Sequence, residues 1–194
     1  MAQAKLTPNR TGDYDTHLRT GKVRLSFPHL FDKYDKSGKY QAQFMIPKKD
    51  KECIKLLEHA IEEAKNYGKA TKWGNTIPKK LKVSVKDGDE DADEYPEQEG
   101  CMIVTAKSSY KPSVYDKDGT EAFDAEELYA GCYVQAIIEA YPYDADGSKG
   151  VAFALLGVKK LAEGERFGGG GVPVSDDDFD EADDEDEGDE DLGI

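Results

Sequence analysis

The sequence predicts a mainly β fold, a small barrel of short strands with one inserted α-helix and a disordered acidic C-terminal tail. Three observations lead to this prediction: several short segments alternate between apolar and polar residues, one segment alone has helical spacing, and charge is segregated along the chain. The expected organisation is a flexible N-terminal arm over 1–18, one folded domain over 19–166, and a glycine linker with the tail over 167–194.

Charge is distributed very unevenly. The 194 residues include 26 Lys and Arg against 41 Asp and Glu, a formal net charge of −15. Residues 175–194 hold 13 of the acidic residues and no basic one, whereas residues 1–86 hold 19 basic and 9 acidic residues. A basic half followed by acidic segments favours a polyanionic partner, with the tail as an internal competitor. An acidic tail that only keeps the protein soluble is the alternative.

The first two predicted strands form a hairpin. Val23, Leu25 and Phe27 alternate with polar residues over 22–27, and Pro28 is expected to end this strand. Residues 34–39 have turn composition, and alternation resumes over 40–46.

One segment has helical spacing. Asp50 is suited to cap the first turn, and apolar residues recur at the helical period at Cys53, Leu57, Ala60, Ile61 and Ala64. We expect this helix over about 50–67, with Gly68 as its stop.

Further strands are predicted over 80–86, 101–107, 132–141 and 151–161. The last two are joined by a turn over 144–147 that contains Asp146-Gly147, a strong hairpin signal. Five or more short strands with one inserted helix fit a small barrel of the oligonucleotide-binding (OB) type. That fold usually places its helix after the third strand, so an additional strand is expected near Thr16 or Trp73.

Neither catalysis nor a metal or cofactor site is expected. The acidic run from Asp87 fails the calcium-loop pattern, because its sixth position is Ala92 and its twelfth is Gln98. The chain has no phosphate loop, nucleophile motif or metal triad. Its three cysteines lack a paired spacing, which suits buried thiols in a reducing cytosol. With no long apolar run and no hydrophobic N-terminal segment, no membrane association is expected.

Basic and aromatic residues occur together in the same segments. Binding of single strands without sequence preference requires a positive groove for phosphates and aromatic faces for bases. Trp73 lies among polar residues and is predicted to stack on a base. For the tyrosines, the alternative is that they only cover the barrel ends. For the lysines, the alternative is that they form an ordinary solvated face. The predicted DNA-binding residues are Lys22, Arg24, Tyr34, Lys36, Lys39, Tyr40, Lys72, Trp73, Lys80, Lys82, Tyr110, Lys111 and Tyr133.

Four short motifs, at 23–31, 73–74, 86–90 and 131–134, resemble those of a bacteriophage and prophage family of single-stranded DNA-binding proteins with an OB barrel. The resemblance implies non-specific binding of single-stranded DNA in phage replication, recombination or repair, in the cytoplasm of an infected bacterium. Duplex DNA and RNA are further candidate ligands, and a homodimer is a candidate assembly.

The acidic tail resembles those with which bacterial and phage single-strand binders recruit replication or recombination proteins. It lacks the terminal Pro-Phe of the bacterial pattern, which puts binding to the same host partners in doubt. An acidic chaperone or DNA mimic, with the tail as the active element, is the alternative function. The predicted docking residues are Phe179, Asp189, Glu190, Asp191, Leu192 and Ile194.

Overall fold

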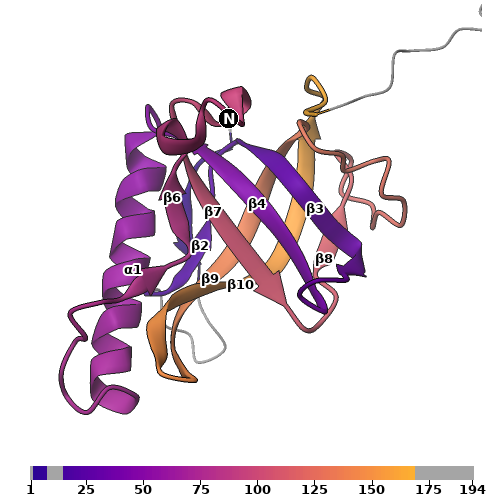
Figure 1. The fold of residues 1–194 in the computed structure, drawn as a ribbon. Coiled ribbons are helices and arrows are strands. Elements are labelled where there is room, and N and C mark those ends of the chain that lie inside the picture. Colours follow the sequence, from indigo (N-terminus) through magenta and orange to yellow (C-terminus); the bar gives the residue numbers. More distant parts are fainter. Residues whose placement is uncertain (1, 8–14, 169–194) are drawn as a thin grey trace, which may run out of the picture.

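A computed structural model describes residues 2–7 and 15–168 (Figure 1). The predicted disordered tail and its docking residues lie outside the described residues, as do residues 8–14 of the predicted arm. Their roles therefore stay predictions.

Five strands form the predicted barrel. They pair in the ring order β3 (Val23–Tyr34), β4 (Lys39–Pro47), β7 (Cys101–Ser108), β10 (Ser148–Ala162) and β9 (Tyr133–Ala145), and β9 pairs with β3 to close it. The β7–β10 pairing is parallel and the others are antiparallel. The ring is thin in two places, because β3–β9 and β7–β10 each pair through only two residues of either strand. The mainly β, barrel-like fold class is thus confirmed, with two narrow seams.

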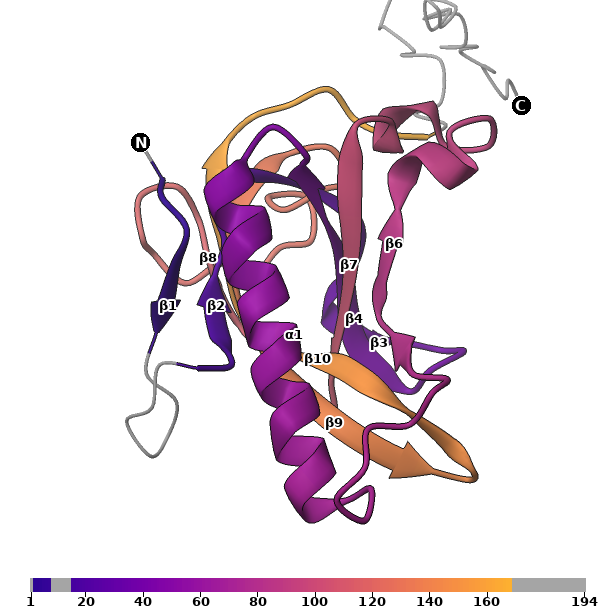
Figure 2. The same cartoon turned by 90° about the vertical axis from the view of Figure 1, so that its left-hand side faces the viewer.

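The helix α1 (Lys51–Thr71), the one α-helix among the described residues, follows β4, the second strand of the ring. Its Asp50 cap is confirmed: the carboxylate accepts a hydrogen bond from the Cys53 N–H at 3.0 Å. The helix continues past the predicted stop at Gly68. This glycine does not end the helix; it lets Trp73 and Pro142 pack closely against the helix backbone. A Cβ there would lie 2.7 Å from the Trp73 ring and from Pro142. Figure 2 shows α1 alongside the barrel, between β1 and β2 on one side and β6 and β7 on the other.

Short strands extend the ring. β1 (Lys5–Thr7) and β2 (His17–Arg19) pair with each other, and β2 pairs with β9. The prediction of an arm without regular structure over 1–18 is therefore wrong for these two segments. The reason is that the backbone of β2 hydrogen-bonds to β9, and the backbone of β1 hydrogen-bonds to β2. The strand expected near Thr16 exists as β2, but outside the ring. β8 (Ser113–Tyr115) pairs with β10.

The predicted strand 80–86 is divided in two. β5 (Lys82–Val83) pairs with β10, whereas β6 (Val85–Asp87) pairs with β7. Two 3-10 turns, η1 (Gly88–Asp91) and η2 (Pro96–Gln98), then lead to β7. The chain crosses from one barrel strand to another at Ser84, so the alternating lysines do not form one continuous face.

Pro28 does not end β3, contrary to the prediction. The strand passes through an irregularity between Ser26 and His29, where Phe27 has φ 44°, and continues to Tyr34. A proline is tolerated at such a bulge because the ladder hydrogen bond is already interrupted there. The predicted Asp146-Gly147 turn is confirmed, since both residues have positive φ as a type I′ turn requires.

The core lies inside the ring and under α1. Its large fully buried side chains include Leu25, Phe44, Phe153 and Leu155. Within residues 2–7 and 15–168, no helix is long and apolar enough to cross a membrane.

Candidate nucleic-acid interface

The strand register creates a surface on the outside of the barrel, over β3, β4, β6 and β7 and the adjoining end of β9, which we call the outer face. Directly paired residues of antiparallel strands point to the same side. Leu25, Phe44 and Val104 are paired and buried in the core. The residues next to them along each strand therefore point outward. Figure 1 looks onto this side of the barrel, with β3, β4 and β7 in front of β9 and β10.

The first row of the outer face crosses five strands. It consists of Tyr133, Arg24, Met45, Ile103 and Lys86. The row has a cation near either end, whereas Met45 and Ile103 between them are each only 1% exposed. The accessible groups of this row are therefore Tyr133, Arg24 and Lys86, which can contact phosphates and a base.

An aromatic and basic cluster surrounds the Arg24 end of this row. The Lys22 ammonium lies 4.4 Å and the Arg24 guanidinium 5.2 Å from the centre of the Tyr133 ring. Both distances are within the range of cation–π attraction. A depression of about 360 Å³ adjoins the cluster, and it is lined by Lys22, Arg24, Lys49 and Tyr133 together with Glu97 and Glu99.

Two further rows are polar. Ser26, Gln43 and Thr105 form one, and His29, Gln41 and Lys107 form the next. The Gln43 side-chain oxygen is buried and has no hydrogen-bond partner among the described residues. Ser26 is buried as well, so the accessible polar groups in the middle of the outer face come from Thr105, His29 and Gln41, with a positive charge at the exposed Lys107.

The fourth row, Tyr34 and Lys39, lies at the β3–β4 turn. The Tyr34 ring packs against His29 with 4.4 Å between ring centres, and Lys36 is exposed in the turn itself. The loop between β7 and β8 carries Tyr110, which is 85% exposed, and Lys111.

Several predicted residues thus come together and others do not. Lys22, Arg24 and Tyr133 meet at one end of the outer face, and Tyr34, Lys36 and Lys39 at the other. Tyr40 sits at the end of β4 on the core side, where the Lys33 ammonium approaches its ring at 5.7 Å. Lys80 and Lys82 lie elsewhere, in a depression beside the β9–β10 turn.

Trp73 is a core residue, and the prediction of a base-stacking indole is wrong. It is 5% exposed, it packs against Gly68, and its indole N–H donates to the Tyr143 carbonyl at 3.2 Å. The polar residues around it in the chain hide this contact, because its apolar neighbours come from α1 and β9. Lys72, its neighbour, is the C-cap residue of α1 and belongs to none of the rows of the outer face.

The structure adds aromatic and basic residues that sequence reasoning missed. Phe27 is 45% exposed because the β3 bulge turns it outward, and its ring meets Tyr95 edge-to-face at 5.8 Å. The Lys86 ammonium lies 5.6 Å from the Tyr95 ring. Alternation alone had assigned Phe27 to the core face, and Tyr95 is hidden within an acidic run. Only Pro28 in mid-strand signalled the bulge.

The acidic run binds lysines of the chain itself. The Lys48 ammonium lies 2.6 Å from both Asp87 and Asp89, and Lys86 contacts Asp91 at 2.5 Å. The hydrogen bond from Lys48 lowers the pKa of both Asp87 and Asp89. In residues 2–7 and 15–168, no group of three or more His, Cys, Asp or Glu side chains is arranged to hold a metal ion.

Comparison with known proteins identifies the family. A family model described as the ssDNA-binding protein of Enterobacter phage Enc34 matches residues 16–189. The chain belongs to this family. The predicted resemblance to phage single-stranded DNA-binding proteins is thereby confirmed.

Individual similar proteins agree with this assignment. Putative protein p50 of Acyrthosiphon pisum secondary endosymbiont phage 1 is 35% identical over 168 residues, which cover 80% of this chain and 88% of p50. The single-stranded DNA-binding protein from bacteriophage Enc34 is 31% identical, with a TM-score of 0.70 over 89% of this chain and 98% of that chain.

The Enc34 protein has also been solved in complex with ssDNA. That structure matches at 29% identity and a TM-score of 0.71, over 84% of this chain and 99% of that chain. Gp2.5, a single-stranded DNA-binding protein encoded by bacteriophage T7, matches at 12% identity and a TM-score of 0.56 over 81% of this chain and 98% of that one. At that identity the likeness concerns the fold alone.

Proposed function

We propose that this protein binds single-stranded DNA without sequence preference along its outer face. The observation that supports this most is the cluster at the Arg24 end of the outer face, where the Lys22 ammonium lies 4.4 Å and the Arg24 guanidinium 5.2 Å from the centre of the Tyr133 ring. The Enc34 relative solved with ssDNA supports the same ligand. No step of bond making or breaking is needed for this activity.

The chemistry of the outer face suits a flexible strand. Phosphates would be neutralised by Lys22, Arg24 and Lys107, while the rings of Tyr133, Phe27 and Tyr34 offer faces or edges to successive bases. Every base has an aromatic face, so stacking tolerates any sequence. The remaining predicted contacts at Lys36, Lys39, Tyr110 and Lys111 would extend the site past the β3–β4 turn, whereas Tyr40 points to the core side and is left out of it.

A salt titration with fluorescent oligonucleotides tests this proposal. Binding of single strands should weaken with salt, with a log–log slope of about −0.7 for each phosphate neutralised. Lys107→Ala should reduce the slope by about 0.7. Lys55→Ala, an exposed lysine on α1, is the matched control and should leave it unchanged. Equal slopes in both variants would remove the outer face from the site.

The same titration tests whether Lys80 and Lys82 contact DNA. The Lys80→Ala, Lys82→Ala double variant removes two charges beside the β9–β10 turn. A smaller change of slope than in Lys107→Ala is expected if DNA follows the outer face. Duplex DNA and RNA of equal length show how selective the site is.

We further propose that the protein coats single strands during phage replication, recombination or repair in the infected bacterial cytoplasm. The acidic tail would then compete with DNA for the basic side chains of the outer face, and it would recruit partner proteins through its apolar residues. Family membership and the 13 acidic residues over 175–194 support this role. A DNA mimic would lose its activity on removal of the tail, whereas a strand binder keeps or gains DNA affinity.

A further inference from the structure

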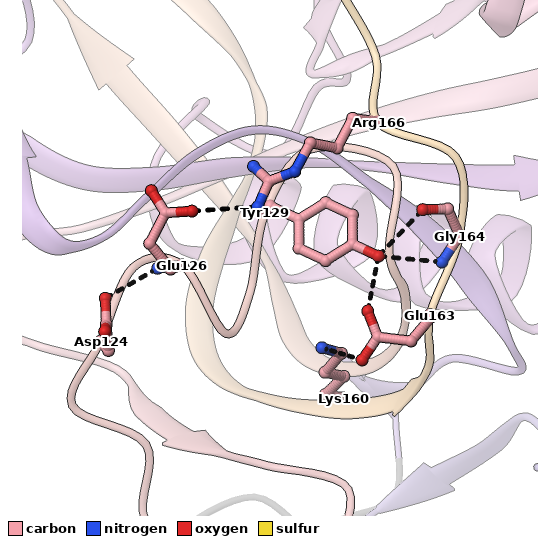
Figure 3. Close-up of polar contacts among 7 residues, drawn as sticks. All are labelled: Asp124, Glu126, Tyr129, Lys160, Glu163, Gly164 and Arg166. Carbon is pink, nitrogen blue, oxygen red and sulfur yellow. Dashed lines mark hydrogen bonds and ion pairs between the residues drawn. The ribbon is translucent and has the colours of Figure 1, made fainter. Parts of the chain in front are cut away.

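The segment after β10 is held against the barrel by a dense set of contacts. We call residues 163–168 the strap. The Tyr129 hydroxyl lies 2.6 Å from a Glu163 carboxylate oxygen and 2.9 Å from the Gly164 carbonyl, and it accepts a hydrogen bond from the Gly164 N–H at 3.1 Å (Figure 3). Lys160 binds the other Glu163 oxygen at 2.6 Å. One hydroxyl therefore anchors the start of the strap.

The rest of the strap is fixed as well. The Arg166 guanidinium lies 4.2 Å from the centre of the Tyr129 ring and 3.0 Å from the Glu126 carboxylate, as Figure 3 shows. The Phe167 N–H donates to the Ala130 carbonyl at 3.0 Å. Gly131 permits this close approach, because a Cβ there would lie 2.0 Å from the Glu165 carbonyl oxygen.

The strap in turn holds Arg24 on the outer face. The Arg24 Nη2 donates to the Glu165 carbonyl at 2.6 Å, and its Nε donates to the Gly131 carbonyl at 3.0 Å. The Phe167 ring lies 4.1 Å from the guanidinium carbon, and Tyr133 lies at 5.2 Å. A guanidinium has five N–H donors, so two carbonyl acceptors leave three donors for a phosphate.

We propose that the strap is a working part of the DNA site. It orients the Arg24 guanidinium toward the DNA backbone, and Tyr129 is the positioning residue that keeps the strap in place. The inference rests on the proposed function, since it assigns the strap a role in that same site. The strap is also the segment that leads into the acidic tail. Because Glu165 accepts a hydrogen bond from Arg24, the chain leading to the tail is attached directly to a residue of the outer face.

A double-mutant cycle in the full-length chain tests this role. Tyr129→Phe keeps the ring and removes only the hydroxyl. Single-strand affinity should fall about fivefold, the equivalent of one net hydrogen bond. The salt slope should fall by about 0.7, as for one lost phosphate contact. In an Arg24→Gln background, Tyr129→Phe should change neither quantity, because the group it positions is gone.

Two controls make the cycle decisive. Tyr115→Phe removes a hydroxyl from an exposed tyrosine of β8 and should leave the affinity unchanged. Arg166→Gln loosens the strap from an exposed position and should repeat the Tyr129→Phe result if that variant proves unstable. An equal loss in both Arg24 backgrounds, or no loss at all, would overturn the strap's role. Failure of the wild-type chain to bind single strands would instead overturn the proposed function.

Discussion

At the scale of single residues, chain neighbours are a poor guide to surroundings. Trp73 is flanked by Lys72 and Gly74, yet it is buried against α1 and β9. Phe27 alternates with polar residues as a core side chain would, yet the bulge exposes it. Arg24, Lys22 and Tyr133 were predicted from composition and do meet, because β3 and β9 pair at that point.

Trp73→Ala should destabilise the protein without weakening DNA binding. Truncation of a buried aromatic side chain costs about 3–5 kcal/mol of unfolding free energy. Urea unfolding measures that loss, and oligonucleotide affinity on the folded fraction measures binding. Tyr110→Ala, at a site 85% exposed, should do the reverse. A stable Trp73→Ala variant with reduced affinity would return the indole to the binding site.

The three thiols should differ in reactivity. Burial raises the pKa of all three thiols, to about 11 for Cys53 and Cys132, and Cys101 is the one that is only partly buried. The thiolate is the reactive form, so a thiol reagent should modify Cys101 in the native protein and reach the other two on unfolding. Counting modified cysteines by mass spectrometry before and after adding urea checks this order. Native modification of Cys53 would contradict the packing of α1.

At the scale of elements, periodicity predicted most of what pairs locally. The Asp50-capped helix, the 132–161 hairpin and the strand over 101–107 follow from spacing and turn residues, and the structure confirms them. The division of 80–86 between β10 and β7 could not be predicted. Each half is specified by a partner strand distant in the chain, and Ser84 carries no local signal for the crossing.

The loop over 87–100 should have a pH-dependent anchor. Hydrogen bonds from Lys48 lower the pKa of Asp87 and Asp89, so their folded values lie below the unfolded value of about 3.9. Their contribution to stability is therefore complete above that pH and is lost as pH falls through the lower folded pKa values. The stability difference between wild type and Lys48→Met should be present at neutral pH and shrink below about pH 4. A pH-independent difference in urea unfolding would show that Lys48 acts only through packing.

At the scale of the whole molecule, the net charge is negative although the outer face carries positive side chains. The chain carries −15 overall, yet the outer face presents Arg24, Lys86 and Lys107. Sequence segregation predicted that separation of charge, and the strand register shows which strands carry the basic part. Which lysines share a face depends on long-range pairing, and so it could not be predicted for Lys80 and Lys82.

Removal of residues after Val174 should raise single-strand affinity at low salt. Under the proposed function, the 13 carboxylates would compete with DNA from an effective concentration that is roughly millimolar for a flexible tether. The gain should shrink as salt rises, because screening weakens both interactions. Fluorescence titration at two salt concentrations measures it.

A tail scrambled at constant composition provides the control for that truncation. Its DNA affinity should match wild type, while recruitment of partner proteins should be lost. Recruitment that survives scrambling would show that Leu192, Gly193 and Ile194 are not a docking motif.

The strap gives the outer face two unlike ends. One end adjoins Arg24 and Gly168, where the chain leaves toward its acidic residues, and the other is the β3–β4 turn. A nucleic acid strand is itself directional, since its two termini differ chemically. A strand seated along the rows would meet the strap with the same terminus in every bound molecule. Successive molecules on one strand would then all point the same way, and a partner protein that follows them could read the direction of travel along the DNA.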